Sequence, residues 1–203
     1  MTAEDGTATT AGEDYARRLS ELESAWWRRL VPVQLPYALH LHHLRLGRTL
    51  DVGCGIGRNL QNLPAGSLGV DHNRHSVDIA QARGLDAVTV EAFRALPPAK
   101  TSGFDGLLLA HVVEHMSESD ADALLAEYVP RLRPGGRLVL ITPQEKGYAT
   151  DATHVRFVDL DSSAALAEGS GCQVERSYSF PFPRAAGHAF PYNEFVLVAR
   201  TPA

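Results

Sequence analysis

Several side chains able to do chemistry lie between His111 and His115. In a helix, residues three and four apart share one face, so a helical segment here would bring His111, Glu114 and His115 together. Two imidazoles and a carboxylate are potential ligands for a divalent metal. His154 follows a later apolar strand and would reach the same cleft. We therefore predict a metal site of His111, Glu114, His115 and His154.

The same region also offers groups that take up protons. A bound metal would lower the pKa of a substrate hydroxyl, and His111 or Glu145 would then accept its proton. Without a metal, His111 or His154 would act as the base, because imidazole titrates near neutral pH. A third interpretation is that Glu114 and His115 only order the loop.

A glycine pattern precedes these residues. Gly53, Gly55 and Gly57 follow a short apolar segment and lead into a helix start. A strand, a glycine turn and a helix N-terminus form a cradle for a nucleotide-type cofactor, which we expect the backbone amides of residues 53–57 to hold. The dinucleotide fingerprint places glycines at its first, third and sixth positions, so this spacing points away from NAD. Asp71 ends the next apolar segment, where a carboxylate can accept ribose hydroxyls.

These residues need elements that bring them to one edge. The sequence predicts alternating strands and helices and therefore a mostly parallel, doubly wound α/β sheet. The last two strands have no helix between them and should pair antiparallel. The expected strands are 49–52, 67–71, 86–90, 104–110, 137–142, 173–180 and 194–200, and the expected helices are 13–30, 33–46, 74–83, 119–133 and 159–168.

Composition limits the class of protein. The 203 residues should form a single domain, 1–203, with residues 1–12 disordered and 13–47 forming an N-terminal helical cap. A net charge of −5 disfavours a nucleic-acid partner. No apolar run is long enough to cross a membrane, so no membrane partner is expected. Cys54 and Cys172 are the only cysteines, which favours a reducing, cytoplasmic location.

Residues 50–57, Leu-Asp-Val-Gly-Cys-Gly-Ile-Gly, closely resemble motif I of the class I S-adenosylmethionine-dependent methyltransferases. Asp71 matches the acid of motif II, Phe104-Asp105 matches motif IV, and residues 131–136 match the turn before the fifth strand. The resemblance implies a Rossmann-like, seven-stranded, mostly parallel sheet with an antiparallel C-terminal strand and N-terminal helices. It also implies S-adenosylmethionine as the cofactor and methyl transfer as the reaction.

The resemblance assigns cofactor contacts residue by residue. One position departs from the family, because Ala92 stands where an acid usually lies near the adenine, so the backbone of Ala92 and Phe93 is expected to replace it. The implied cofactor-binding residues are Asp51, Gly53, Cys54, Gly55, Gly57, Asp71, His72, Ala92, Phe93, Ala110 and His111.

The metal pattern is similar to that of two magnesium-dependent groups, the ubiquinone-pathway O-methyltransferases and the small-RNA 2′-O-methyltransferases. Both carry Glu-x-x-Glu-His at this place, and here His111 replaces the first glutamate. The resemblance implies Mg²⁺. Magnesium prefers oxygen ligands, however, so zinc, iron or manganese would suit a histidine-rich site at least as well.

The acceptor is expected to be a small molecule that meets residues 144–151 and a late loop, residues 180–194, which is rich in proline and aromatic residues. Aromatic faces with scattered polar groups suit a sugar or an aromatic ring. The chain is similar to actinobacterial methyltransferases that modify sugars, including the mycobacterial enzymes of methylmannose polysaccharides. We predict O-methylation of a saccharide hydroxyl.

Two other functions stay open, as does a homodimer. One is a metal-free methyltransferase acting on a phenol, amine or carboxylate. The other is a non-catalytic partner subunit that binds S-adenosylmethionine.

Overall fold

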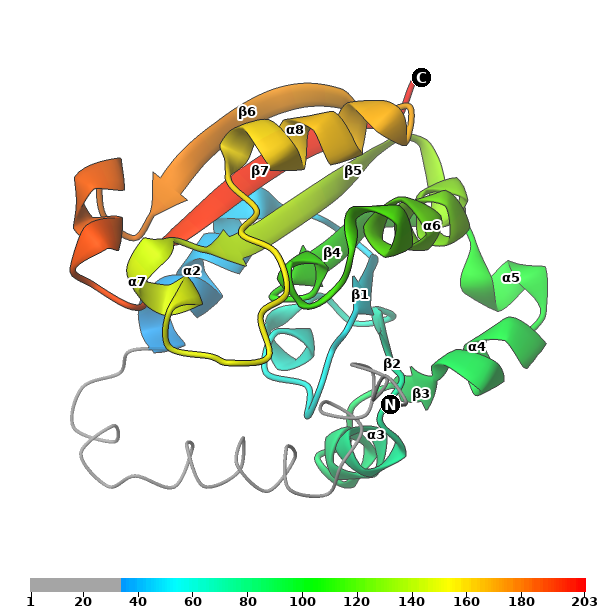
Figure 1. Ribbon diagram of the computed structural model, residues 1–203. Helices are drawn as coiled ribbons and strands as arrows, with labels where there is room; N and C mark the ends of the chain where they lie inside the picture. The colour runs from blue at the N-terminus through cyan, green and yellow to red at the C-terminus, as the bar shows by residue number, and fades with distance from the viewer. Residues whose placement is uncertain (1–33) are drawn as a thin grey trace, which may run out of the picture.

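The computed structural model describes residues 34–203 and contains one seven-stranded sheet of order β3-β2-β1-β4-β5-β7-β6 (Figure 1). Only β7 runs antiparallel to its neighbours β5 and β6. The predicted fold class is confirmed. The strands are β1 Thr49–Val52, β2 Leu68–Asp71, β3 Ala87–Thr89, β4 Phe104–Ala110, β5 Leu132–Pro143, β6 Gln173–Phe180 and β7 Glu194–Arg200.

Alternating side chains of the central strands form two hydrophobic cores. Leu107 and Leu109 of β4 join the core under α6 (Glu118–Tyr128) and α8 (Leu160–Gly169). Leu108 points to the opposite core, which α2 (Gln34–Leu44) covers with Leu41 and Leu44. Successive residues of a strand face opposite sides of its sheet, so a continuous apolar strand must be covered on both. Figure 1 shows α6 and α8 together on one side.

Helix starts are set by short polar side chains. Asn73 caps α3 (Arg74–Ala82) by accepting hydrogen bonds from the amides of His75 and Ser76, as its position in the sequence predicts. Ser117 caps α6 and Asp159 caps α8 in the same way. These caps fix where each helix leaves the carboxyl edge of the sheet.

The structure corrects several boundaries. The helix expected over 119–133 ends at Tyr128, and a 3-10 turn, η5 (Val129–Arg131), leads directly into β5. The Pro-Gly-Gly segment therefore lies inside β5, where the register is irregular. Three short helices were not expected from the sequence: α4 (Val90–Ala95), α5 (Pro98–Thr101) and α7 (Glu145–Tyr148). Short helices give too little periodicity to be recognised in a sequence.

The predictions for residues 1–12 and for a helix over 13–30 lie outside the described residues. The second expected N-terminal helix, 33–46, is observed as α2. No helix in residues 34–203 is long and apolar enough to cross a membrane.

Aromatic contacts attach α2 to β6, a strand at the edge of the sheet. The ring of His40 stacks on Phe180 with centroids 4.1 Å apart, and its Nε2 lies 2.6 Å from the hydroxyl of Tyr178. Burial, helped by the charges of Arg176 and His43, lowers the pKa of His40 to about 4. The docked helix therefore holds a neutral imidazole.

This contact predicts a pH-dependent stability. Unfolded His40 takes up a proton below about pH 6.5, whereas the folded ring resists until about pH 4. Stability should therefore fall as pH falls through this window. When the pH is lowered from 7 to 5, the free energy of unfolding measured in urea should fall by about 1–2 kcal/mol more for the wild type than for His40→Phe. The exposed His75→Phe should behave like the wild type, and an identical loss in His40→Phe would contradict the prediction.

Candidate functional site

The glycine loop after β1 has a conformation that side chains would strain. Gly53, Gly55 and Gly57 have φ angles of 74°, 53° and 85°, in the left-handed region. A Cβ on Gly53 would lie 2.4 Å from Cγ2 of Val112, and one on Gly57 would lie 2.3 Å from Cδ1 of Leu85. A Cβ on Gly55 would meet open space. The loop thus packs tightly on two sides and faces an opening at Gly55.

Four of the five amides of residues 53–57, those of Gly53, Cys54, Gly55 and Gly57, are already hydrogen-bonded within the protein. Those of Gly53 and Cys54 donate to the carbonyl of Val70 at 2.8 and 3.2 Å, and that of Gly57 donates to Cys54 at 2.9 Å. The amide of Gly55 donates to a side chain of β2, described next. These bonds hold the loop in one conformation. A ligand would therefore meet its backbone surface mainly by shape, with few amide hydrogens left to bind.

Asp71 fixes this loop to the end of β2. Its Oδ2 accepts the amide hydrogen of Gly55 at 2.7 Å, and its Oδ1 accepts that of Asn73 at 2.8 Å. The exposed His72 places Nδ1 3.6 Å from Oδ1. Each carboxylate oxygen keeps a second lone pair, so the predicted contact with ribose hydroxyls is compatible with these bonds.

Asp51, at the end region of β1, is a buried acid with one unpartnered oxygen. The residue is 1% exposed, and among residues 34–203 its Oδ2 has no hydrogen-bond partner. Burial, followed by the nearby charge of Asp71, raises the pKa of Asp51 to about 8. A buried polar atom without a partner is costly, which favours a bound group that donates a hydrogen bond here. Burial also raises the pKa of the neighbouring Cys54 thiol.

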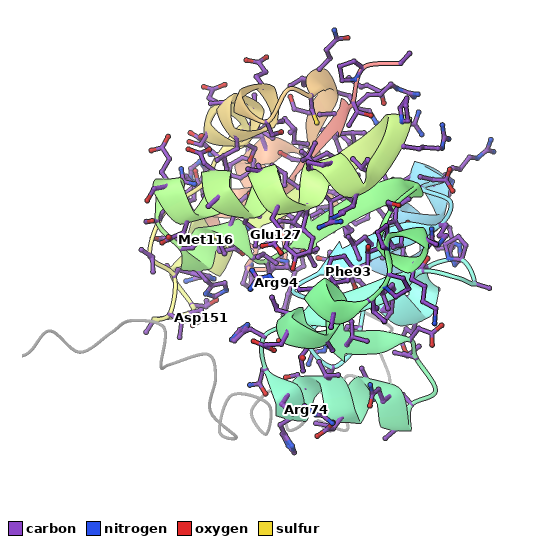
Figure 2. All side chains as sticks on the ribbon, turned by 90° about the vertical axis from the view of Figure 1, so that its right-hand side faces the viewer. Arg74, Phe93, Arg94, Met116, Glu127 and Asp151 are labelled. Carbon is purple, nitrogen blue, oxygen red and sulfur yellow. The ribbon has the colours of Figure 1, made fainter. Side chains whose placement is uncertain are left out.

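The residues expected near the adenine are largely committed elsewhere. The amide of Ala92 donates to Oγ1 of Thr89 at 3.2 Å, because α4 begins directly after β3. The ring of Phe93 is buried against Tyr128, with centroids 5.5 Å apart. Figure 2 shows Phe93 beside the Arg94–Glu127 ion pair that joins α4 to α6. Cofactor contacts by Ala92 and Phe93 stay a prediction. They would have to come from backbone groups other than the amide of Ala92.

His111, just after β4, has an unusual backbone and a fully engaged ring. Its φ is 59°, and its amide donates to the carbonyl of Ile141 at 2.9 Å. Nδ1 lies 3.2 Å from Oε1 of Glu114, and Nε2 lies 2.8 Å from Oε1 of Glu194. Non-glycine residues in this region of φ are uncommon and concentrate at functional sites.

The two carboxylates determine what His111 can do. Burial alone would lower the pKa of His111, but the hydrogen bonds and charges of Glu114 and Glu194 outweigh it and raise the pKa to about 10. An imidazole that donates to a carboxylate from each nitrogen is protonated. In this arrangement His111 has no lone pair for a metal or for a substrate proton, so its contacts do not support the predicted roles as metal ligand and base.

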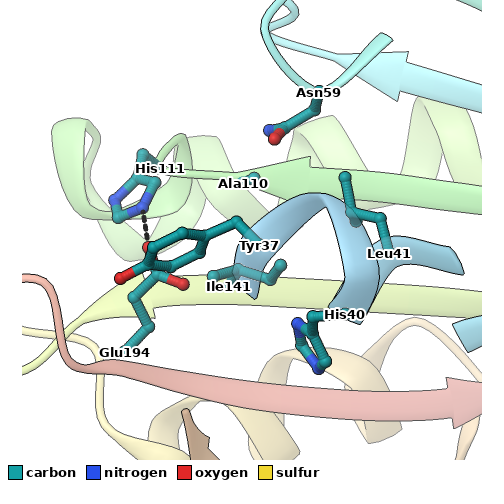
Figure 3. Close-up of a pocket in the computed structure, with 8 residues that line it drawn as sticks. All are labelled: Tyr37, His40, Leu41, Asn59, Ala110, His111, Ile141 and Glu194. Carbon is teal, nitrogen blue, oxygen red and sulfur yellow. Dashed lines mark hydrogen bonds and ion pairs between the residues drawn. The ribbon is translucent and has the colours of Figure 1, made fainter. Parts of the chain in front are cut away.

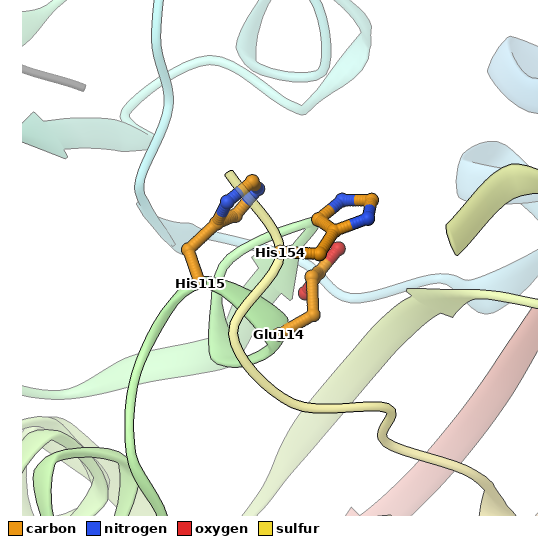
Figure 4. A group of neighbouring side chains, drawn as sticks. All are labelled: Glu114, His115 and His154. Atoms are coloured by element: carbon orange, nitrogen blue, oxygen red, sulfur yellow. The ribbon is translucent and has the colours of Figure 1, made fainter. Parts of the chain in front are cut away.

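The expected metal residues come together without His111. Among residues 34–203, ligand atoms of Glu114, His115 and His154 all lie within 4.8 Å of one another (Figure 4). The shared helix face expected over 111–115 is wrong in detail. Only a 3-10 turn, η4 (Val113–His115), forms, and it follows the left-handed turn at His111.

Backbone carbonyls orient both imidazoles of this trio. Nδ1 of His115 donates to the carbonyl of Thr153 at 3.2 Å, and Nδ1 of His154 donates to that of Tyr148 at 2.7 Å. In a neutral ring this leaves the lone pair on Nε2, as in many metal-bound histidines. Glu114 is fully buried, and within the described part of the chain its Oε2 has no hydrogen-bond partner. These three side chains can therefore offer two nitrogens and one oxygen to a cation.

Glu145, the other predicted base, lies in an ion pair. Both of its oxygens contact the guanidinium of Arg184, one of them at 2.8 Å, and His188 lies 3.8 Å away. Its bonds to Arg184 lower the pKa of Glu145. A carboxylate stabilised in its charged form is a weak proton acceptor, so its surroundings do not support the predicted role.

A pocket opens between α2 and the carboxyl ends of the strands (Figure 3). Glu194 contributes its carboxylate here; it is the last residue of the late loop expected to meet the acceptor, but the sequence did not single out its carboxylate. Because β7 is antiparallel, its first residue lies at the edge where β5 ends, opposite Pro143. That reversal was predictable and could have pointed to Glu194. The lining residues are Tyr37, His40, Leu41, Asn59, Ala110, His111, Ile141 and Glu194.

The late loop is organised by a buried amide. Nε2 of Gln144 donates to Oγ of Ser179 and to the carbonyl of Glu194, while Oε1 accepts from Asn193 at 3.0 Å. Gln144 is fully buried. Its role is thus to hold Glu194 and the loop in place, and direct contact of Gln144 with a substrate is not supported.

Comparisons with known proteins agree with this geometry. Residues 50–140 match the family model described as a methyltransferase domain. A ubiquinone biosynthesis O-methyltransferase of Xanthomonas oryzae pv. oryzae is 28% identical over 142 residues, covering 62% of this chain and 59% of that protein. One of Burkholderia multivorans is 28% identical over 145 residues, covering 63% and 62%. The chain thus spans about three fifths of the length of these curated relatives.

Solved structures share the fold. Magnesium protoporphyrin IX methyltransferase of Synechocystis PCC 6803 with bound SAH aligns with a TM-score of 0.68 at 14% identity, covering 97% of this chain and 100% of that one. A SAM dependent methyltransferase of Archaeoglobus fulgidus aligns with a TM-score of 0.63 at 17% identity, covering 83% and 94%. At such identities the likeness concerns the fold alone.

The geometry of Asp71 predicts the effect of one substitution. In Asp71→Asn the amide nitrogen cannot accept a hydrogen bond, so one of the two backbone bonds is lost together with the charge. Affinity for S-adenosylhomocysteine, measured by calorimetry, should fall roughly tenfold or more. The exposed Asp78→Asn, which loses only a pair with Arg74, should bind as the wild type does. Equal affinity in Asp71→Asn would show that this carboxylate does not support the cofactor site.

Proposed function

We propose that this chain is a class I S-adenosylmethionine-dependent methyltransferase and that it transfers the methyl group to a hydroxyl of a small, uncharged acceptor. One observation carries the proposal. The glycine loop, Asp71, the trio of Glu114, His115 and His154, and the pocket at Glu194 all meet at the carboxyl edge of the sheet. Ligands of doubly wound sheets bind at this edge.

The cofactor fits the observed loop. S-adenosylmethionine carries a ribose, for which Asp71 has lone pairs, and an ammonium group, which can donate to the partnerless Oδ2 of Asp51. The opening at Gly55 allows close approach to the backbone. The sulfonium supplies the methyl group and the driving force of the reaction.

A divalent cation fits the trio, on the evidence of the partnerless Oε2 of Glu114 and the oriented rings of His115 and His154. When bound, it would lower the pKa of the acceptor hydroxyl. Two nitrogens and one carboxylate favour manganese, iron or zinc over the Mg²⁺ that the resemblance implied.

The protein's own contribution is mainly alignment. The acceptor oxygen attacks the methyl carbon in line, the carbon–sulfur bond breaks, and its electron pair returns to sulfur to leave a neutral thioether. The hydroxyl proton must leave as the carbon–oxygen bond forms. In the metal-free form, Nε2 of His154 is the site that can take it, since its Nδ1 hydrogen is held by Tyr148. Holding the two reactants in contact supplies much of the rate.

The acceptor class rests on the pocket and on the relatives. The curated relatives are ubiquinone biosynthesis O-methyltransferases, which supports oxygen as the acceptor atom. A saccharide is the acceptor we favour, because aromatic rings of the late loop such as Phe182 and Tyr192 are exposed and can stack on a sugar face. The net charge of −5 favours a small molecule over nucleic acid, and two unpaired cysteines suit the cytoplasm.

The proposal is tested by transfer of labelled methyl from S-adenosylmethionine to a panel of neutral sugars and catechols, with and without EDTA. We expect transfer to a hydroxyl that EDTA abolishes and added Mn²⁺ restores. Transfer that EDTA leaves unchanged would identify a metal-free methyltransferase. Binding of the cofactor without transfer to any acceptor would favour a non-catalytic partner subunit.

Metal binding can be measured apart from activity. Calorimetry of the full chain with Mn²⁺ or Zn²⁺ should show one site, and His115→Ala and His154→Ala should each weaken it at least about tenfold, since each removes a ligand. His188→Ala, which removes an exposed imidazole beside Glu145, should have no effect. If the wild type binds neither metal, or if all variants bind equally, the trio is not a metal site.

A further inference from the structure

The pocket beside His111 has an unusual balance of hydrogen-bonding groups. Its walls are apolar where Leu41, Ala110 and Ile141 line it, and a carboxylate lies at its rim (Figure 3). Its volume is about 30 Å³, so a small ring would lie across its mouth, where the few polar groups decide which ring binds.

Most of the donors around the pocket are already used. The hydroxyl of Tyr37 donates to the carbonyl of Tyr192, and the neutral His40 shares a hydrogen with Tyr178. Both ring nitrogens of His111 donate to carboxylates. Tyr37 and His111 therefore have no hydrogen left for an incoming anion, and the other two donors of the lining, the amide of Asn59 and the ring of His40, are uncharged and cannot balance a negative charge.

Glu194 is different, because it is an acceptor with capacity left. Among residues 34–203, Oε1 contacts Nε2 of His111 at 2.8 Å, and no hydrogen bond to Oε2 is found. Gln144 anchors the backbone of Glu194, so the side chain is held at the pocket and is only 8% exposed. A fixed carboxylate oxygen at a pocket wall binds a hydroxyl hydrogen and repels a second carboxylate.

The charged groups around His111 also favour an uncharged acceptor. Two carboxylates, Glu114 and Glu194, flank the single imidazole of His111. Of these two carboxylates, Glu194 lines the pocket and is the one that an incoming ring would meet. Exclusion of like charge is a common way for a site to reject competing ligands.

We propose that Glu194 selects the acceptor, by accepting a hydrogen bond from a hydroxyl of an uncharged ring and by excluding rings that carry a carboxylate near that hydroxyl. This inference rests on the proposed function and narrows its substrate class. It also excludes carboxylates as the methylated group. Glu194 becomes a residue that touches the substrate.

Paired probes test this directly. The full chain, saturated with S-adenosylhomocysteine, is titrated with catechol and 2,3-dihydroxybenzoate, and with methyl glucoside and methyl glucuronide, which differ within each pair by one carboxylate. The same pairs compete for labelled methyl from S-adenosylmethionine. We expect the neutral member of at least one pair to bind and react at least tenfold better than its anionic partner.

The variant Glu194→Gln keeps the shape of the side chain and removes its charge. In this variant, the neutral member of a pair should bind and react less than threefold better than its anionic partner. The affinity for S-adenosylhomocysteine should be unchanged. Glu168→Gln, an exposed change on α8, should keep the wild-type ratio. The wild-type ratio tests the proposal even if Glu194→Gln fails to fold.

The outcomes distinguish failure of the role of Glu194 from failure of the proposed methyltransferase function. Wild-type protein that binds S-adenosylhomocysteine but prefers anionic members, discriminates within no pair or binds no probe overturns the role of Glu194 alone. An unchanged ratio in folded Glu194→Gln does the same. Failure to bind S-adenosylhomocysteine overturns the proposed function itself.

Discussion

The carboxylate of Asp71 is the interaction on which the rest of the site depends. One oxygen holds the amide of Gly55 in the glycine loop, and the other holds the amide of Asn73, which in turn caps α3. A single side chain therefore joins the loop, the end of β2 and the start of the next helix. Since the amides of Gly53, Cys54 and Gly57 donate to backbone carbonyls, the shape of the cradle follows from these bonds together with Asp71.

A second set of charges organises the opposite half of the cleft. His111 connects Glu114, beside the two oriented imidazoles, to Glu194, in the pocket. Its left-handed backbone turns the chain sharply after β4 and makes both contacts possible. His111, at the place where the resemblance implies a glutamate, thus offers no oxygen ligand and instead bridges two carboxylates.

The sequence predicted the parts of the fold that depend on local pattern. Apolar strands buried on both faces, the cap at Asn73 and the final antiparallel pair all follow from residue types at short spacing. The site was predictable only in part. Glu114, His115 and His154 meet as expected, but the engagement of His111 by Glu194 joins residues far apart in the chain, through a strand whose direction must be known first. Likewise, the pairing of Glu145 with Arg184 depends on how the late loop folds back.

A crystal structure of the chain with S-adenosylhomocysteine tests the central claim most directly. We predict electron density for the ribose at Asp71 and for the sulfur atom between the glycine loop and the pocket that Glu194 lines. Density elsewhere, or a loop that remains closed to the ligand at saturating concentration, would contradict a methyl-donor site at this edge of the sheet.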